Sequence, residues 1–269
     1  MATGVLPIFI GRATRIAEFC ENAEKEYIAG IRLGLVTDTQ DTTGSVIVIN
    51  APSPIPDISG GRHTTVAPEE LAAVIPRFLG AQKQLPPMYS AIKIGGKKLY
   101  ELARRGEDVP REQRDIFISK IEILGGSGRD YTLRVACSKG TYIRTLCHDI
   151  GADLGCGGAM SSLRRTRAGT FTLEQARTLD EILDSISNDS IENMLIPVDS
   201  VFSEYPAITL NAAQTLKCKN GIPPPAPHLP DGKYRFYGPD KEFLILGEII
   251  SGETKIAKTF FLPPQTNKI

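Results

Sequence analysis

Apolar residues recur along this chain with the periods of strands and helices. Between residues 131 and 137, Tyr131, Leu133 and Val135 alternate with more polar neighbours, which predicts a half-buried strand. After residue 142, a helical spacing of apolar residues predicts a helix, on the positions Ile143, Leu146, Cys147, Ile150 and Leu154. The same reasoning predicts strands at 5–10, 27–33, 45–49 and 116–124, and helices at 13–20, 68–79 and 99–105.

The turn between the strand 131–137 and the helix after it carries the strongest candidate chemistry. Gly140 permits a sharp turn, and Thr141 is the predicted N-cap of the helix. Tyr142 and Arg144 are therefore expected in the first helical turn, where free N–H groups and the helix dipole favour an anion. A cation and an aromatic ring suit a phosphate, a carboxylate or a stacked base. The alternative is an ordinary junction with a solvated arginine.

The composition changes towards the C-terminus. The stretch 173–204 contains eight acidic residues and a single basic one, Arg177, which indicates a solvated helical face. Beyond Tyr205 the pattern changes to short β runs at 208–210, 234–237 and 243–248, separated by glycine and proline turns. We therefore predict two domains, one over 1–200 and a small β-rich module over 206–265.

Charge is balanced over the whole chain, with 31 basic and 31 acidic residues, so only its distribution is informative. Two basic clusters stand out, one near Tyr89 and Tyr100 and one at 164–167. Their members are Lys93, Lys97, Lys98, Arg104, Arg105, Arg111, Arg114, Arg164, Arg165 and Arg167. Basic residues interleaved with aromatic rings favour binding of RNA or DNA over a merely solvated face.

Cysteine and histidine usage excludes some classes of site. The five cysteines are odd in number and form no C-x-x-C pair, which indicates reduced thiols in a cytosolic protein. The three histidines lie far apart in the sequence, so no metal site is expected. No apolar run approaches the length of a transmembrane helix, so no membrane association is expected.

Four segments together resemble the bacterial TruB-type tRNA pseudouridine synthases, in order and over essentially the whole chain. They are 2–15 (Ala-Thr-Gly-Val-Leu-Pro to Gly-Arg-Ala-Thr-Arg), 33–44 (Leu-Gly, Thr-Asp-Thr-Gln-Asp and Gly), 87–104 (Pro-Met-Tyr-Ser-Ala-Ile-Lys to Ala-Arg) and 138–144 (Ser-Lys-Gly-Thr-Tyr-Ile-Arg). The β-rich tail resembles the PUA-like RNA-binding module of bacterial members. The resemblance implies an α+β fold with a mixed, largely antiparallel sheet, followed by this small β-rich module.

The resemblance also implies an activity, the isomerisation of uridine-55 in the TΨC loop of tRNA to pseudouridine, without metal or organic cofactor. Carried over by residue, Arg144 and Tyr27 are catalytic. Tyr27, Tyr142 and Leu163 bind the flipped base, and Lys93 and Lys139 are expected to contact the RNA. The implied partner is the T-arm of tRNA, and the implied protein is a cytoplasmic monomer with no obligate protein partner.

One family motif has no counterpart in these 269 residues. In the family, the nucleophilic aspartate lies in Gly-His-x-Gly-Thr-Leu-Asp-Pro, just upstream of the segment that Ala2–Pro7 resembles. We therefore expect the nucleophile just upstream of Met1, and we expect Arg144 to lack its acidic partner. Asp38 and Asp41 are expected to cap turns or to contact RNA indirectly. The alternatives are a non-catalytic RNA-binding or RNA-folding protein and a DNA-binding scaffold, for which no helix-turn-helix or zinc signature is present.

Overall fold

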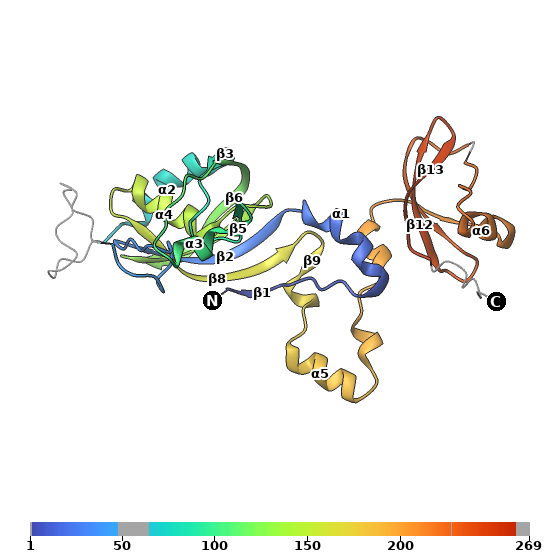
Figure 1. Cartoon of the computed structure of the whole chain (residues 1–269), viewed down its shortest axis with the longest axis horizontal. Coiled ribbons are helices and arrows are strands. Elements are labelled where there is room, and N and C mark those ends of the chain that lie inside the picture. Colours follow the sequence, from blue (N-terminus) through green and yellow to red (C-terminus); the bar gives the residue numbers. More distant parts are fainter. Residues whose placement is uncertain (1, 48–64, 227, 262–269) are drawn as a thin grey trace. The chain divides into compact units, whose positions relative to one another are not determined.

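The computed structural model describes residues 2–47, 65–226 and 228–261, and it separates into two compact units (Figure 1). Unit 1 comprises residues 1–7 and 21–176, and unit 2 comprises residues 8–20 and 177–269. Each unit has an apolar core of its own.

A large sheet forms the frame of unit 1. Its strand order is β1 (Ala2–Gly4), β8 (Gly158–Ala168), β2 (Lys25–Leu33), β7 (Asp130–Cys137), β6 (Arg114–Ser127) and β3 (Gly80–Gln84), with β9 (Phe171–Thr172) beside β8. β1 runs parallel to β8, whereas the other neighbours are antiparallel. The predicted mixed, largely antiparallel α+β fold is thus confirmed.

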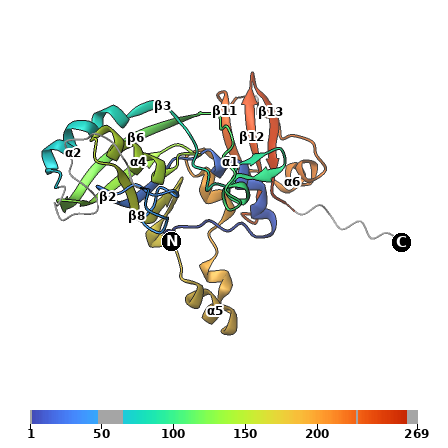
Figure 2. The same cartoon turned by 60° about the vertical axis from the view of Figure 1, so that its left-hand side comes forward.

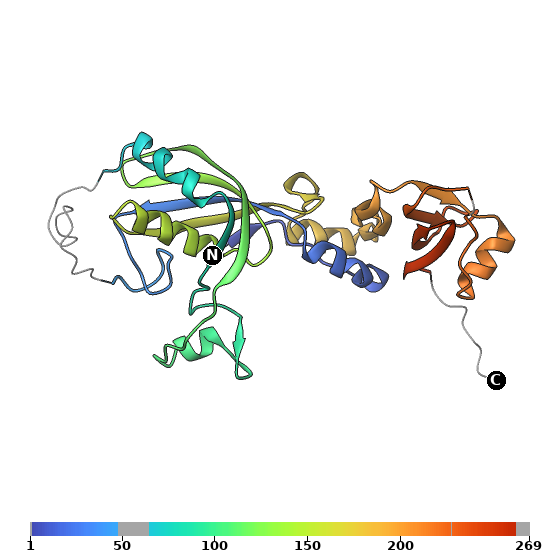
Figure 3. The same ribbon diagram turned by 90° about the horizontal axis from the view of Figure 1, so that it is seen from above.

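Helices cover one face of this sheet, as Figure 3 shows from above. They are α2 (Pro68–Val74), which continues as the 3₁₀ helix η2 (Ile75–Phe78), and α4 (Ile143–Asp153). Pro68 at the first helical position and the Glu70 carboxylate, which accepts from the Ala67 N–H at 2.7 Å, fix the start of α2. The core between helices and sheet consists of Ala29, Ile31, Leu33, Leu71, Ile118, Leu133, Val135, Leu146, Cys147 and Ile150 with their neighbours.

Between β3 and β6 the chain makes an excursion, residues 85–113, which projects from the sheet (green in Figure 3). It contains the hairpin β4 (Lys93–Ile94) and β5 (Lys97–Lys98) and the short helix α3 (Leu99–Ala103). Leu99 and Leu102 are buried, whereas Lys93 and Lys97 are exposed. The basic cluster near Tyr100 therefore lies on a projecting element.

Unit 2 contains a second, smaller sheet with the order β10 (Ala207–Thr209), β11 (Gly232–Tyr237), β12 (Phe243–Ile250) and β13 (Glu253–Thr259), seen in Figure 2. The helix α6 (Ala212–Lys219) packs beside it through Cys218, which is fully buried. Upstream lie α5 (Leu179–Ser187) and the 3₁₀ helices η4 (Ile191–Met194) and η5 (Val198–Phe202), while η3 (Leu173–Gln175) belongs to unit 1. The β-rich module expected after residue 206 is present.

A segment from the start of the chain packs on this small sheet. The 3₁₀ helix η1 (Gly11–Ile16) precedes α1 (Ala17–Glu21), and Ile16 is buried with Phe202, Leu246 and Phe260. The Arg12 guanidinium donates to the Phe260 carbonyl at 2.8 Å. These contacts connect residues near Ile16 and Phe202 to the β module, and the compact units divide the chain differently from the predicted domains 1–200 and 206–265.

Two predicted strands differ from the structure. Residues 5–10 form no strand, and Leu6, Ile8 and Ile10 are 69%, 71% and 63% exposed. Pro7 has no N–H to donate to a ladder, and the strand lies earlier, at β1. Of the predicted strand 45–49, Val46 forms an isolated bridge to Thr37, and residues 48–49 lie outside the described residues. Among the longer elements, β3, β8, β13 and α6 were not predicted from the pattern.

Within the described ranges, none of the helices has the length and apolar character needed to cross a membrane. The same ranges hold no cluster of three or more histidine, cysteine, aspartate or glutamate side chains that is able to bind a metal ion. The cysteines are free thiols, and four of the five are buried.

We predict that Leu133→Ala, in the core of unit 1, lowers the free energy of unfolding by about 2–5 kcal/mol, because it leaves a cavity under the helices. Leu133 is fully buried, whereas Leu124 on the neighbouring strand is 39% exposed. Leu124→Ala is the matched control and should cost less than about 1 kcal/mol. Urea unfolding followed by circular dichroism measures both values. Equal losses would contradict the core described above.

Candidate active site

The start of α4 is built from a tight turn after β7. Gly140 has a φ of +80°, a left-handed conformation that favours glycine. The Thr141 hydroxyl donates to the Ser138 carbonyl at 3.0 Å. The prediction of Thr141 as N-cap is therefore wrong: Tyr142 is the N-cap, and its side chain makes no capping hydrogen bond. Arg144 lies in the first turn, as predicted.

Gln84, at the end of β3, holds this turn in place. Its side-chain amide is bidentate on the backbone of Tyr142: its oxygen accepts from the Tyr142 N–H at 2.8 Å and its nitrogen donates to the Tyr142 carbonyl at 3.1 Å. Gln84 is 5% exposed, so both bonds are shielded from water. The N-terminus of α4 is thereby anchored to the edge strand of the sheet.

Arg144 reaches from α4 to the loop after β2. Its Nη1 lies 3.4 Å from the Asp41 carboxylate and makes a longer contact of 3.5 Å with the Thr39 carbonyl. The side chains of Arg144 and Asp41 are 29% and 17% exposed, so the pair is only partly screened by water. Both contacts use Nη1, which leaves Nε and Nη2 without a partner among the described residues.

The loop 36–47 is tied together by its two carboxylates. Asp41 accepts hydrogen bonds from the Thr39 hydroxyl and from the hydroxyl and N–H of Thr43, and Asp38 accepts from the Ser45 N–H at 2.8 Å. The predicted turn-capping role is confirmed for both. Partial burial acts to raise the pKa of Asp41, but the bonds from Thr43 and Thr39 and the Arg144 charge outweigh it and lower that pKa. Asp41 is thus held ionised.

Tyr27 and Leu163 lie on the neighbouring strands β2 and β8, on the sheet face that the helices cover. Ala29 is opposite Leu163 and Tyr27 is opposite Arg165, and Tyr27 and Leu163 both pack against the core of unit 1. Burial raises the pKa of Tyr27, although the nearby Arg165 charge partly opposes this, so the phenol stays protonated at neutral pH. The Arg165 Nε itself donates to the Val5 carbonyl at 2.5 Å.

The remaining predicted site residues are exposed. Lys139 lies in the turn before α4, and Lys93 lies on β4 of the excursion. Neither contacts Arg144 in the described part of the chain. Arg144 therefore contacts the loop 36–47, and Tyr27 lies on the strand next to that of Leu163. The two lysines contribute charge at the surface.

Comparison with known proteins identifies the family to which this chain is similar. A model of the TruB family pseudouridylate synthase N-terminal domain matches residues 1–143, and a model of the tRNA pseudouridylate synthase B C-terminal domain matches residues 144–203. The tRNA pseudouridine synthase B of Syntrophomonas wolfei is 42% identical over 253 residues, which are 92% of this chain and 80% of that relative. The enzyme of the same name from Francisella tularensis subsp. novicida is 43% identical over 263 residues, 97% of this chain and 82% of that relative.

This chain belongs to the TruB family of pseudouridylate synthases. Solved structures share its fold at lower identity. A crystal structure of a Cbf5-Nop10-Gar1 complex aligns with a TM-score of 0.66 and 24% identity, over 97% of this chain and 73% of that one. A structure of an H/ACA RNP bound to a substrate RNA containing 2′-deoxyuridine aligns with a TM-score of 0.67 and 22% identity, over 98% and 74%.

The structure corrects one expectation about the site of this family member. Arg144 was expected to lack an acidic partner, but it forms an ion pair with Asp41 at 3.4 Å. The sequence offered a basis for predicting this ion pair, because Asp41 lies in the Thr-Asp-Thr-Gln-Asp segment that carries the resemblance to the family. Gln84 was missed altogether, since a glutamine at the end of a strand has no signature of a backbone clamp.

We predict a pH-dependent effect of Asp41→Asn. Since the folded-state pKa of Asp41 lies below the ordinary value of 3.8, its contribution to stability is present above that value and is lost as the pH falls through the lower folded pKa. Wild type should exceed Asp41→Asn in stability at pH 7, and the difference should shrink below about pH 3.8. Urea unfolding at several pH values measures it. Asp115→Asn, at a side chain that is 87% exposed, is the control and should show little difference throughout.

Proposed function

We propose that this protein converts uridine-55 in the TΨC loop of tRNA to pseudouridine. Membership of the TruB family and relatives named tRNA pseudouridine synthase B support an isomerase that acts on tRNA. The proposal is carried by the contacts of Arg144. Asp41 holds one guanidinium nitrogen at the start of α4, and the two other nitrogens have no partner among the described residues. A guanidinium oriented in this way is able to pair with a second carboxylate in bidentate fashion.

Each predicted site residue then has a role that its surroundings support. Arg144 orients and stabilises the attacking carboxylate, and Tyr27 offers a neutral aromatic face on which the flipped uracil stacks. Leu163 forms an apolar wall beside it, on the neighbouring strand. Tyr142, whose backbone is fixed by Gln84 at the start of α4, is proposed to contact the same base. No metal or organic cofactor takes part in the proposed reaction.

Asp41 is unsuited to be the nucleophile. Its carboxylate already accepts bonds from Thr39 and Thr43 and pairs with Arg144, and a carboxylate whose pKa is lowered in this way is a weaker base and a weaker nucleophile. We propose instead that the nucleophile belongs to the family's Leu-Asp-Pro motif, which does not occur in the 269 residues. Asp41 then acts through Arg144 as a positioning residue.

The exposed basic residues suit the T-arm of tRNA. Lys93 and Lys97 on the excursion, Lys139 in the turn and Arg164 on β8 are exposed, so their charges are available to phosphates. We assign catalysis to unit 1 and additional RNA contact to the PUA-like β module after residue 206. The protein would act as a monomer in the cytoplasm.

We predict that Lys93→Ala together with Lys97→Ala weakens tRNA binding and reduces the slope of log Kd against log salt by roughly 0.7–0.9 per lost phosphate contact. The matched control is Lys83→Ala together with Lys120→Ala, which removes the same charge. Those lysines are paired with Asp115 and Glu122 at 3.2 and 2.9 Å. Filter binding at several salt concentrations gives both slopes. An unchanged slope in the Lys93→Ala/Lys97→Ala variant would show that the excursion does not contact the phosphates of the RNA.

We predict that the 269-residue chain forms no pseudouridine, and that a chain extended at its N-terminus by the family segment with Leu-Asp-Pro does. Tritium release from tRNA carrying 5-tritiated uridine measures the reaction, and Asp→Asn in the added motif should abolish it. Turnover by the 269-residue chain would mean that Asp41 or another of its acids attacks. No turnover by either chain, despite tRNA binding, would favour the non-catalytic RNA-binding alternative.

A further inference from the structure

The side chain of Gln84 takes the place of a cap at the start of α4. Tyr142 is the N-cap, with an extended backbone (φ −94°, ψ 107°), and its own side chain makes no capping hydrogen bond. Its carbonyl accepts from the Leu146 N–H at 3.0 Å, inside the helix, and also from the Gln84 amide at 3.1 Å. Its N–H donates to the Gln84 oxygen at 2.8 Å. Both peptide groups that flank Tyr142 are therefore fixed from outside the helix.

Gln84 is itself attached to the sheet. Its backbone lies opposite Arg114 in the ladder between β3 and β6. Directly after it, the base of the excursion is closed by the Arg111 guanidinium, which donates to the Pro86 carbonyl at 3.0 Å. The clamp thus ties the start of α4 to a strand of the sheet, and its amide is buried on a backbone that is held on both sides.

Two shielded amide bonds supply more orientation than stability. Each neutral hydrogen bond contributes only about 1 kcal/mol net, because both partners give up bonds to water. Apolar groups of the same shape often replace such a buried contact at little cost. The amide of Gln84, however, accepts on one side and donates on the other, so it selects a single orientation of the Tyr142 backbone.

This backbone carries two residues of the proposed site. Arg144 lies two positions beyond Tyr142, in the first turn of α4. Its ion pair with Asp41 is 3.4 Å long and only partly shielded, so it orients the guanidinium but leaves the position of the main chain to the helix. Bidentate pairing of a guanidinium with a carboxylate tolerates little displacement, so the position of this first turn matters for the reaction.

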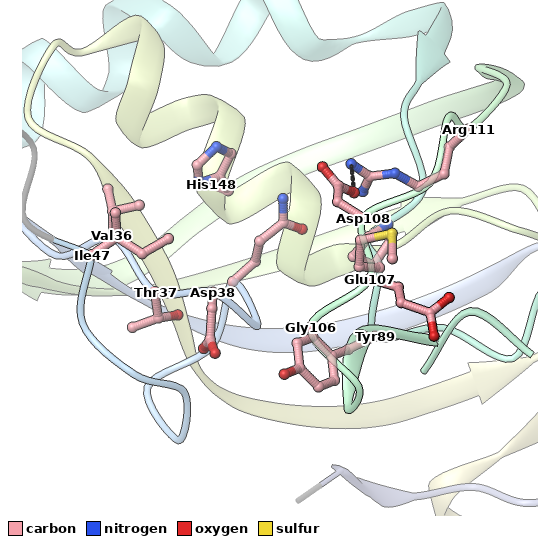
Figure 4. Close-up of a pocket in the computed structure, with 14 residues that line it drawn as sticks. Val36, Thr37, Asp38, Ile47, Tyr89, Gly106, Glu107, Asp108, Arg111 and His148 are labelled. Atoms are coloured by element: carbon pink, nitrogen blue, oxygen red, sulfur yellow. Dashed lines mark ion pairs between the residues drawn. The ribbon is translucent and has the colours of Figure 1, made fainter. Parts of the chain in front are cut away.

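Gln84 itself is not placed to bind a substrate. The pocket of unit 1, about 430 Å³ between the loop 36–47, the excursion and α4, is lined by neither Gln84 nor Tyr142 (Figure 4). The Gln84 side chain is buried, and both its oxygen and its nitrogen are engaged by the Tyr142 backbone. An influence of Gln84 on the reaction therefore acts through the main chain that it holds.

We propose that Gln84 is a positioning residue of the reaction, which holds the first turn of α4 where Arg144 meets the attacking carboxylate and Tyr142 meets the base. The proposal rests on the proposed function, because that function supplies the carboxylate and the base. Loss of the clamp should then lower kcat, whereas contacts between the exposed lysines and the RNA should persist.

The test uses the chain extended at its N-terminus by the family segment with Leu-Asp-Pro. Tritium release from tRNA gives kcat and KM, and circular dichroism gives the folded fraction by which kcat is corrected. Gln84→Met keeps the length of the side chain but makes neither bond. Its kcat should fall roughly 10- to 100-fold, while KM for tRNA should change by less than about threefold.

Gln84→Glu adds a signature that a purely structural role would not produce. A protonated carboxyl reproduces both bonds, whereas a carboxylate only accepts and repels the Tyr142 carbonyl. Burial favours the protonated form and raises the pKa of the introduced carboxyl above its ordinary value of about 4.3. Measured against wild type at the same pH, kcat of Gln84→Glu should approach wild type near about pH 5.5 and fall towards Gln84→Met as the pH rises. Gln82→Glu, at a partly exposed position of the same strand, is the control and should keep a constant ratio.

The outcomes separate the two proposals. Turnover by the extended wild type, together with a kcat that the Gln84 variants leave unchanged after correction for folding, would overturn the positioning role alone. A ratio for Gln84→Glu that does not vary with pH, or a raised KM at unchanged kcat, would overturn it as well. No turnover by the extended wild type would overturn the proposed function and the positioning role with it.

Discussion

The position of α4 depends on direct backbone contact with β8. A Cβ placed on Gly151 would lie 2.1 Å from the backbone nitrogen of Gly158, and one placed on Gly158 would lie 2.5 Å from the Cys147 carbonyl. Neither position admits a side chain, so the helix lies closer to the strand than ordinary helix–sheet packing allows. Because the helix carries Arg144, Thr145 and His148, this contact sets where all three stand relative to the strand that bears Leu163.

The other end of the helix is fixed by different means. Gln84 clamps the backbone of Tyr142, and Asp41 holds the side chain of Arg144. The first is a shielded pair of neutral hydrogen bonds and the second is a charged contact open to some water, so the clamp fixes the backbone while the ion pair orients the side chain. An arginine whose side chain is already held by one carboxylate loses little conformational entropy when it binds a second anion. This is the advantage of a preorganised site.

Local periodicity predicted β2, α2, α3, β6, β7 and α4 in unit 1, because elements such as β7 and α4 have one buried face, but it missed β3 and β8. Local periodicity failed where tertiary contacts determine the local structure. Val5–Ile10 reads as a strand by composition, yet Pro7 interrupts the ladder and the apolar side chains alternate into solvent. Ile16, near the start of the chain, packs with Phe202 and Phe260, which lie far along it. No local periodicity predicts this contact. Arg144 was predicted in the first turn of α4 because its motif is contiguous, whereas Gln84 was missed because its role depends on a partner 58 residues away.

The loop 36–47 contributes to the ion pair of Arg144 and also borders the pocket of unit 1. Asp41 faces Arg144, whereas Asp38 and Gln40 face the pocket, and the hydrogen bonds of Asp41 to Thr39 and Thr43 and of Asp38 to Ser45 tie the loop into one structure. Because these bonds tie the loop together, a change in the backbone of the loop also moves the carboxylate that orients Arg144.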